Sequence, residues 1–513
     1  MAETESQKNK RIAKNTLMLY MRMILIMAVT LYTSRVILEA LGESDYGIYN
    51  VVGGVVAMFS ILSSPLSNAI TRFLTYELGT GNMKKLSSIF STSINIQVLL
   101  SIIILVICEV VGIWFINEKM TIPAERIGAA TLVLHFSLLT FIVNLISVPY
   151  NATILSHEKM GVFAFIGIFD ASLRLVVAFL IRMSSNDKLV IYSILLFVSS
   201  LCLLLLYYIY CRTHFEETKY KYIIDKGLFK EMAGFAGWNA FGHLTGTLNN
   251  QGINLLVNLF FGLKVNAARA IADQVNNAFI QLVNNFTQAI NPQITKSYAQ
   301  GNIEYMTKLT NSGSKFSFFI LLLFFVPFFL ETETVLGIWL VQVPQDTAIF
   351  VRLILIGALM LVMGSTHYYA IMATGKIKRY TLEISVLSAL IFPLSWLLFF
   401  LGAPAYSAYV VFAVVYFLQD FIRLLTLKRL ISFSIIDYYK YYFSRISLVT
   451  ILAFIVPLLV YLNMAPSIKR LVIIILVSVI WVSLMIFFLG LDKNERSFVK
   501  NKTIQIIQKK AKR

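Results

Sequence analysis

Seven charged or amide side chains recur every three or four residues between Phe261 and Asn302, in a stretch long enough to cross a membrane as a helix. They are Arg269, Asp273, Asn277, Gln281, Asn284, Gln288 and Asn291. Read at helical spacing, they share one face, and the other face is Ala, Ile, Val, Phe and Leu. Guanidinium groups bind anions, and amides both donate to and accept from hydroxyls. The stretch therefore predicts a polar binding face on a membrane helix.

The preceding segment repeats the pattern along a run otherwise rich in Leu, Phe and Gly. Its polar residues are Asn239, His243, Thr247, Asn250, Asn254 and Asn258. Unpaired amides that face hydrocarbon are costly, so such groups turn toward a bundle interior or a water-filled cavity. We expect Asn250, Asn254, Asn277, Gln281 and Gln288 to line a cavity. The alternative is that these amides interlock the two helices and line nothing.

Composition places the chain in the membrane. It has 513 residues, of which 58% are hydrophobic, and a mean hydropathy of +0.76, whereas soluble domains are roughly 45–50% apolar. The three cysteines lie in or beside apolar runs, and the five histidines have no metal-ligand spacing, so we expect no disulfide framework, metal or other cofactor. The longest connection between apolar runs is 212–232, which leaves no room for a soluble catalytic domain. We therefore expect no enzyme.

At about 20 apolar residues per crossing, the sequence predicts an all-α protein with fourteen spans. They are 16–38, 46–70, 89–116, 128–154, 161–182, 189–211, 233–259, 265–291, 315–338, 347–373, 380–402, 406–428, 442–462 and 469–490. We divide the chain into an N-terminal lobe, 1–211, a cytoplasmic linker helix, 212–232, and a C-terminal lobe, 233–430. Spans 13 and 14 and a basic tail, 431–513, follow.

The net charge of +18 is unevenly distributed. Lys and Arg gather at the N-terminus, in 212–230 and in the tail, whereas the segment from Glu331 to Asp346 has neither. This is the positive-inside pattern, which predicts that both termini are cytoplasmic. The charge is therefore explained by topology and anionic lipid headgroups, and we expect no nucleic-acid partner.

The two halves of the chain share a spacing of glycines and small motifs. Gly42, Ala69-Ile70 and Gly81-Asn82 recur 220 residues later as Gly262, Ala289-Ile290 and Gly301-Asn302. Each match falls at the same place relative to an apolar segment, as an internal duplication requires. We expect two six-helix lobes that are parallel repeats.

Charged residues inside the apolar runs are candidates for function. Asp170 with Arg174 and Arg269 with Asp273 are spaced as i,i+4 pairs, which can neutralise themselves. Arg22 has no acid one turn away in its own helix, so it needs a partner from elsewhere or an anionic ligand. Asp273 and His243 are the candidates for ion or proton coupling, although His243 also fits a hydrogen-bonded interior histidine.

Two segments resemble the polysaccharide transporters of the multidrug/oligosaccharidyl-lipid/polysaccharide (MOP) exporter superfamily. One runs from Ser34 to Tyr49 and continues at Gly79 to Asn82, and the other combines Phe260 to Gly262, Ala289 to Pro292 and Gly301 to Asn302. The related peptidoglycan-precursor flippases have an Ala-Asp-Arg run on the eighth span. This chain has Ala272-Asp273-Gln274 there, so the arginine of that run is missing and a peptidoglycan substrate fits the sequence less well. Arg269, one turn earlier, is the candidate to replace the missing arginine.

The resemblance implies a multi-pass flippase of the bacterial cytoplasmic (inner) membrane. Its substrate would be an undecaprenyl-pyrophosphate-linked oligosaccharide used for O-antigen, capsule or exopolysaccharide, and its partners would include membrane lipids and glycan polymerase or export machinery. The resemblance also implies two lobes around a central cavity, alternating access, and two extra C-terminal spans that hold the lipid tail.

The residues fit this substrate on physical grounds. A pyrophosphate carries about two negative charges, which guanidinium groups bind bidentately, so Arg22 and Arg269 are the expected anion ligands. The amide rows fit sugar hydroxyls. The alternatives are a multidrug/cation antiporter of the same superfamily, with Asp273 as its carboxylate, and a membrane glycosyltransferase or polymerase, for which the sequence offers no acid-bearing external loop.

Overall fold

The computed structural model describes residues 5–57, 63–118, 122–222, 225–340, 343–497 and 500, and the regular structure in these ranges is entirely helical. A helix satisfies its own backbone hydrogen bonds, as a chain in hydrocarbon must. Eleven helices among these residues are long and apolar enough to cross a membrane. The predicted all-α membrane fold is confirmed.

Three of the fourteen predicted spans are not among these eleven. The range 46–70 includes residues 58–62, which lie outside the described residues. The ranges 233–259 and 265–291 are helical throughout and form two arms of α7, Lys226–Ala299. The amides of these two arms lower their hydropathy below that of a plain membrane span, as their sequence predicts.

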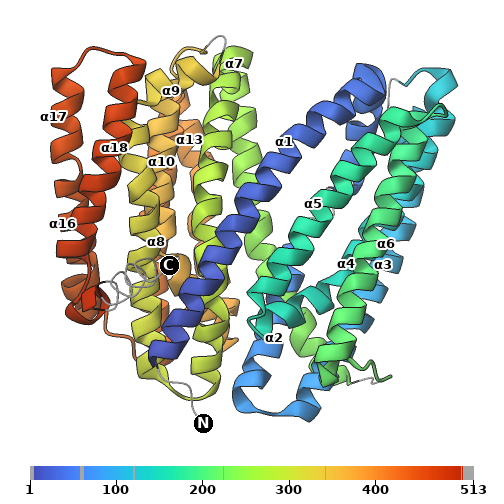
Figure 1. The fold of residues 1–513 in the computed structure, drawn as a ribbon, viewed down its shortest axis with the longest axis horizontal. Coiled ribbons are helices and arrows are strands. Elements are labelled where there is room, and N and C mark those ends of the chain that lie inside the picture. The colour runs from blue at the N-terminus through green and yellow to red at the C-terminus, as the bar shows by residue number, and fades with distance from the viewer. Residues whose placement is uncertain are drawn as a thin grey trace, which may run out of the picture. The chain divides into compact units, whose positions relative to one another are not determined.

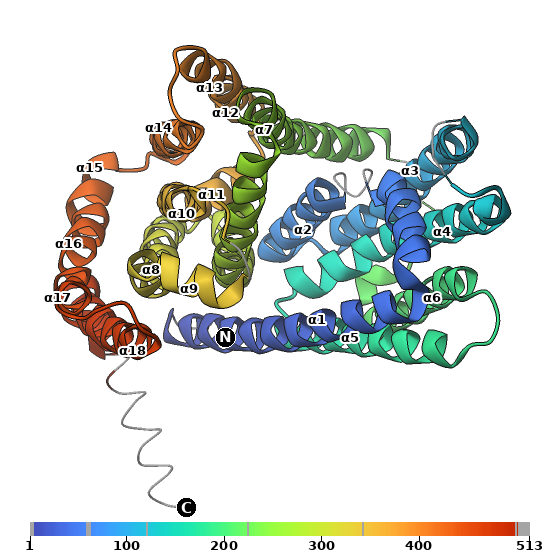
Figure 2. The same ribbon diagram turned by 90° about the horizontal axis from the view of Figure 1, so that it is seen from above.

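The chain folds into two compact units. Unit 1 comprises residues 1–244, 288–302 and 372–381. Its helices are α1 (Glu5–Ala57), α2 (Ser63–Thr80), α3 (Met83–Glu118), α4 (Ile127–Ser156), α5 (Met160–Met183), α6 (Lys188–His214) and part of α7, with short turns η2 (Ala124–Arg126) and η3 (Glu216–Thr218). Helix α1 packs along α5 and α4 packs along α6 (Figures 1 and 2).

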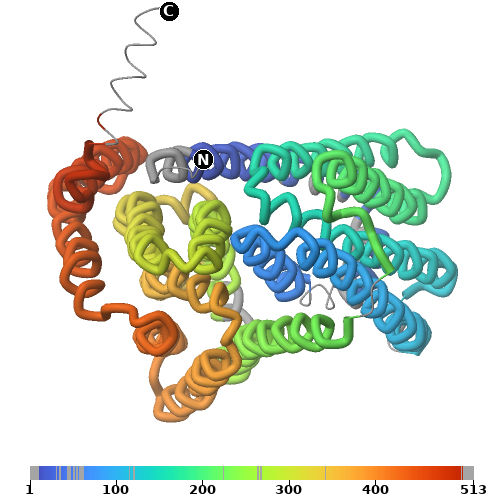
Figure 3. Tube along the Cα trace, turned by 90° about the horizontal axis from the view of Figure 1, so that it is seen from below, coloured from blue at the N-terminus to red at the C-terminus, as the bar shows by residue number. Residues whose placement is uncertain are grey.

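Unit 2 comprises residues 245–287, 303–371 and 382–513. Its helices are the middle of α7, α8 (Ile303–Leu330), α9 (Thr332–Trp339), α10 (Thr347–Met363), most of α11 (Ser365–Thr374) and α12 (Lys378–Ala389), α13 (Ile391–Phe400), α14 (Ser407–Ile431), α15 (Ile435–Asp437), α16 (Ser444–Ala453), α17 (Ile455–Asn463) and α18 (Ile468–Met485), with π-helical turns η4 (Tyr438–Phe443) and η5 (Ile486–Gly490). Helices α7, α8, α10 and α14 supply most of its main apolar core, and α17 packs beside α18 (Figure 3).

The two compact units do not follow the expected domains, because unit 1 also contains 233–244, 288–302 and 372–381 of the expected C-terminal lobe. No single helix covers 212–232, because α6 ends at His214, α7 begins at Lys226, and the described residues between them hold only the turn η3. The segment 431–513 belongs to unit 2. Arg470 of α18 explains this attachment, since its Nε lies 2.6 Å from Oε1 of the fully buried Glu331.

The two halves repeat at the level of the backbone. Gly42 breaks α1 at φ 76° and ψ 168°, and Gly262 breaks α7 at φ 79° and ψ −174°. This region of backbone conformation is essentially restricted to glycine. Gly81 and Gly301 also have positive φ, and the Asn after each donates its backbone N–H to the carbonyl five residues earlier. The 220-residue offset therefore recurs as local structure.

Three helices of unit 1 are joined by one arginine. Arg126 at the start of α4 forms ion pairs with Asp45 of α1 and with Asp187, which caps α6. Burial acts to raise the pKa of Asp187, but hydrogen bonds from Arg126 and from the backbone of Val190 outweigh it and lower the pKa. A depressed folded-state pKa means that this carboxylate stabilises the fold at neutral pH and ceases to do so as acid protonates it.

Candidate functional site

The second arm of α7, residues 263–299, has two distinct faces. Six apolar side chains at helical spacing are buried: Ala268, Ala272, Val275, Phe279, Val283 and Phe286. All but the last belong to the main apolar core of unit 2. The opposite face holds the predicted polar row, of which Arg269 is buried and the other members are partly or fully exposed: Asp273, Asn277, Gln281, Asn284, Gln288 and Asn291. The amphipathic reading of this stretch is confirmed.

The five predicted glycan-binding amides are accessible in the structure. Asn250, Asn277 and Gln281 are exposed, and Asn254 and Gln288 are partly exposed. Among the described residues, none of these five side-chain amides forms a hydrogen bond. They therefore do not interlock the two arms of α7, and their donors and acceptors are available to water or to a ligand. Four of them lie in unit 2 and Gln288 lies in unit 1.

Arg269 is buried and engaged by its own unit. Its Nη2 donates to the carbonyl of Asn250 at 2.9 Å and its Nε donates to the hydroxyl of Tyr409 at 3.1 Å. Asp273 lies 3.4 Å away, which forms the expected i,i+4 ion pair. The guanidinium thus joins both arms of α7 to α14. This arrangement is that of a structural crosslink, which sequence spacing alone did not reveal.

Arg22 has a different environment, within unit 1. Its guanidinium lies 4.3 Å from the centre of the Phe163 ring on α5, and its Nε is buried without a hydrogen-bond partner in the described structure. The guanidinium also packs against Gly167, where a Cβ would lie only 2.9 Å from Cζ. Asp170 is nearby but is held by Arg174 at 3.2 Å. Arg22 and Arg174 together carry two positive charges, and Asp170 carries one negative charge. The net positive charge suits an anion.

The two candidates for ion coupling lie in different units. Asp273 is partly exposed beside Arg269 and acts electrostatically on Tyr409 and Tyr416 of α14. His243 is exposed on the first arm of α7, at the end of the segment that belongs to unit 1. No group of three His, Cys, Asp or Glu side chains that would hold a metal occurs among the described residues.

A buried carboxylate that the sequence analysis missed organises one end of unit 1. Glu158, in the loop between α4 and α5, pairs with Arg11 of α1 at 2.9 Å and with Lys296 of α7 at 2.7 Å. Gln293 donates to it at 2.5 Å, and Asn15 donates to its backbone carbonyl at 3.5 Å. Three separate segments therefore meet on one side chain. The only sequence signal was a lone acid between two apolar runs.

The repeat places a second contact at the same end of unit 1. Arg72 of α2 donates to the carbonyl of Ala373 at 3.2 Å and lies 4.7 Å from the centre of the Phe73 ring. Ala373 lies near the end of α11, two residues before Gly375, whose φ is 75°, and Glu158 has a φ of 58°. In both halves, a basic side chain of a helix thus contacts the chain at or near a left-handed residue.

Comparison with known proteins identifies the architecture. No family model and no curated protein matches the chain in sequence. A crystal structure of MATE in complex with MaD3S has 13% identity and a TM-score of 0.71 and covers 82% of this chain and 97% of its own. A MOP superfamily transporter from Pyrococcus furiosus, described as having a binding pocket of reverse polarity, has 12% identity and a TM-score of 0.71, with coverages of 84% and 99%.

An outward-facing multidrug resistance MATE family transporter of the MOP superfamily gives similar values, with 12% identity, a TM-score of 0.70 and coverages of 84% and 99%. The chain has the fold of a MATE transporter. At these identities the likeness concerns the fold, and it agrees with a multi-pass membrane protein. In this MATE-like fold, Glu158 and Arg269 form ion pairs, and the Nε of Arg22 has no hydrogen-bond partner in the described structure.

Replacing Glu158 by glutamine should destabilise the MATE-like fold by about 3 kcal/mol, because removing one member of a buried charge pair leaves its partners uncompensated. Arg11 and Lys296 keep partial access to solvent, which holds the loss at the lower end of the usual range. The measurement is thermal unfolding of the purified protein in detergent.

Two matched variants separate the causes. Glu216→Gln, at an exposed position, should leave the unfolding temperature unchanged. Glu158→Gly should be less harmful than Glu158→Ala, since glycine accommodates the positive φ at this position. A Glu158→Gln protein as stable as the wild type would show that the network does not hold the three segments together.

Proposed function

We propose that the protein moves an undecaprenyl-pyrophosphate-linked oligosaccharide from the cytoplasmic to the outer leaflet of the bacterial cytoplasmic membrane, by alternating access, for surface polysaccharide assembly. The observation that carries this proposal is the accessible row of unbonded amides on α7. Amides directed into hydrocarbon are costly, so the row fits a water-accessible cavity. Sugar hydroxyls match the paired donors and acceptors of Asn and Gln.

The anionic part of the substrate is assigned to Arg22. Its buried Nε has no partner within the described structure, and Arg174 adds a second positive charge near Asp170. A guanidinium keeps its proton in a low-dielectric environment and binds phosphate oxygens in a fork. Arg269 contributes mainly by fixing the two arms of α7, and through them the amide row.

The Glu158 network and the Arg72 contact fit a closure at the cytoplasmic side. The positive-inside distribution assigns the N-terminal end of α1 and the loop between α4 and α5 to that side. Both contacts join segments from the two sequence repeats. In alternating access both would break when the substrate enters from the cytoplasm and re-form when it leaves.

Drug export by cation exchange is the second candidate. A multidrug resistance transporter shares the fold, and Asp273 supplies one partly exposed carboxylate beside the amide row. Its ion pair with Arg269 neutralises it in the present structure, and the many amides are poorly matched to apolar cations. The oligosaccharide is therefore the better match.

The accessibility of the amide row tests this proposal. In a protein from which Cys108, Cys202 and Cys211 have been removed, Asn277→Cys and Gln281→Cys should react with a membrane-impermeant maleimide in intact cells. They should react because water reaches this face of α7. Added lipid-linked oligosaccharide should protect both cysteines from the reagent.

The control is Val106→Cys, which is also exposed in the structure but lies on an apolar face of α3. It should not react, because a thiol in hydrocarbon neither ionises nor meets the reagent. If neither Asn277→Cys nor Gln281→Cys reacts in any condition, while a cysteine placed in a surface loop does, the amides do not line a water-accessible cavity.

A further inference from the structure

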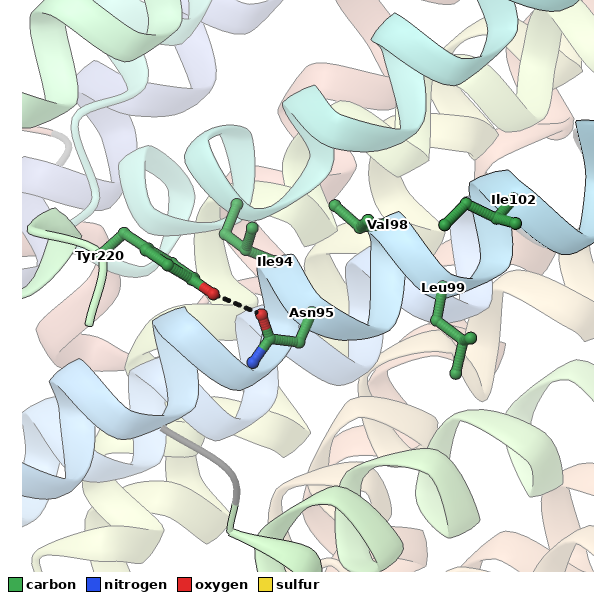
Figure 4. A pocket seen from close by; sticks show the side chains of 6 residues that line it. All are labelled: Ile94, Asn95, Val98, Leu99, Ile102 and Tyr220. Atoms are coloured by element: carbon green, nitrogen blue, oxygen red, sulfur yellow. Dashed lines mark hydrogen bonds between the residues drawn. The ribbon is translucent and has the colours of Figure 1, made fainter. Parts of the chain in front are cut away.

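A groove of about 420 Å³ lies on α3, outside the residues assigned to transport. Its walls are Ile94, Asn95, Val98, Leu99 and Ile102 of α3 together with Tyr220 of the connection between α6 and α7. Figure 4 shows the Tyr220 ring reaching across to α3, where its hydroxyl donates to Oδ1 of Asn95 at 2.8 Å. The two polar side chains of the groove thus bind one another, and the rest of its lining is aliphatic.

The groove opens onto a surface that is suited to lipid. Val98, Leu99 and Ile102 are exposed, and the same apolar face continues along α3 through Ile103, Val106 and Val110. Such a face on a membrane-crossing helix is covered by hydrocarbon. Ile94 and Ile102 are eight residues apart, so the groove extends about 12 Å along the helix, close to the roughly 15 Å of one leaflet.

The other end of the groove is polar and basic. The backbone N–H of Lys221 donates to the hydroxyl of Ser91 at 3.1 Å, one turn before Ile94. Lys219 and Lys221, on either side of Tyr220, are both exposed. Tyrosine with an apolar ring and a polar hydroxyl is typical of the membrane interface, and lysines at that level attract anionic headgroups by about 1 kcal/mol each.

We propose that this groove binds one acyl chain of an anionic phospholipid, with its phosphate beside Lys219 and Lys221. The aliphatic lining takes the chain, the Tyr220 ring covers it at the interface, and the two lysines select the charge. The lipid would fix the connection between α6 and α7 on α3. This site is independent of the proposed substrate, because it lies on the lipid-facing side of α3 and uses none of the amide row.

Native mass spectrometry of the detergent-purified protein tests the site with phosphatidylglycerol and phosphatidylcholine of the same acyl chains. The wild-type protein should retain one more bound molecule of phosphatidylglycerol than of phosphatidylcholine. Val98→Trp, which fills the groove, should lose that molecule, and Val106→Trp, further along the same face, should keep it. The double change Lys219→Gln with Lys221→Gln should weaken retention about 30-fold, from two headgroup contacts.

Equal retention of the two lipids would overturn the proposal, and so would unchanged retention by Val98→Trp or by the double lysine variant. The outcome does not depend on transport, because no oligosaccharide is present. A protein that binds the lipid but moves no glycan would support this site and refute the proposed function. The reverse result would remove the lipid site alone.

Discussion

Replacing Arg22 by alanine should lower glycan export by about tenfold to a hundredfold, since hydrogen bonds to charged groups contribute about 1.5–3 kcal/mol and each 1.4 kcal/mol is a factor of ten. The folded protein should remain in the membrane at nearly the wild-type level. In the described structure its guanidinium packs against the Phe163 ring and Gly167 and interacts electrostatically with Asp170 and Tyr207, but its Nε forms no hydrogen bond. The measurement is surface glycan in a strain that depends on this protein.

Two further variants test the geometry of this anion site. Arg22→Lys should recover only part of the export, because an ammonium group lacks the planar fork. Gly167→Ala should resemble Arg22→Ala, since the added methyl group would occupy the space of the guanidinium. Full export by Arg22→Ala would show that Arg22 binds no part of the substrate and would leave the pyrophosphate without an assigned ligand.

Replacing Arg269 by alanine should instead destabilise the protein, lowering its free energy of unfolding by about 3–5 kcal/mol. The amount of folded protein in the membrane should fall accordingly. The guanidinium holds the carbonyl of Asn250, the hydroxyl of Tyr409 and the carboxylate of Asp273. Its loss would remove the bond to the Asn250 carbonyl and leave the Tyr409 hydroxyl and the Asp273 carboxylate without this partner. Thermal unfolding in detergent and the amount of membrane-inserted protein measure the effect.

The Tyr409→Phe variant is the matched comparison, because it removes one of these contacts and keeps the ring. It should cost about 1 kcal/mol, the usual net value of one hydrogen bond. An Arg269→Ala protein that is as stable as the wild type but inactive would contradict the structural role of Arg269. Arg269 would then be a substrate ligand, as its sequence position first suggested, and not a crosslink.

Periodicity and composition predicted those features that depend on the membrane itself. An apolar run in hydrocarbon must be helical, and the buried face of α7 follows from the spacing of Ala268, Ala272 and Val275. The recurrence of Gly42, Ala69-Ile70 and Gly81-Asn82 at an offset of 220 residues predicted a repeat, and the breaks at Gly42 and Gly262 agree with it. Both glycines adopt a backbone conformation that other residues avoid, which explains why the glycine is present in each half.

Contacts between distant segments could not be predicted in this way. Glu158 and Lys296 are far apart in sequence, and neither belongs to the polar row, so no spacing connects them. The partners of Arg269 were equally hidden, because a carbonyl and a tyrosine hydroxyl leave no pattern in the sequence. Mixed charges and apolar residues, as in 212–232, fit a turn lying on α3 as well as a surface helix, and the described residues between His214 and Lys226 hold only the turn η3.

The substrate is tested most directly by reconstitution. The purified protein would be placed in liposomes that contain an undecaprenyl-pyrophosphate-linked oligosaccharide in both leaflets, and an impermeant glycosidase would be added outside. The wild-type protein should expose the protected inner half of the oligosaccharide to cleavage with time, whereas the Arg22→Ala protein should not. If cleavage stops at the outer leaflet while the same vesicles exchange a cationic dye for protons, the protein is a drug antiporter, and the proposed function is wrong.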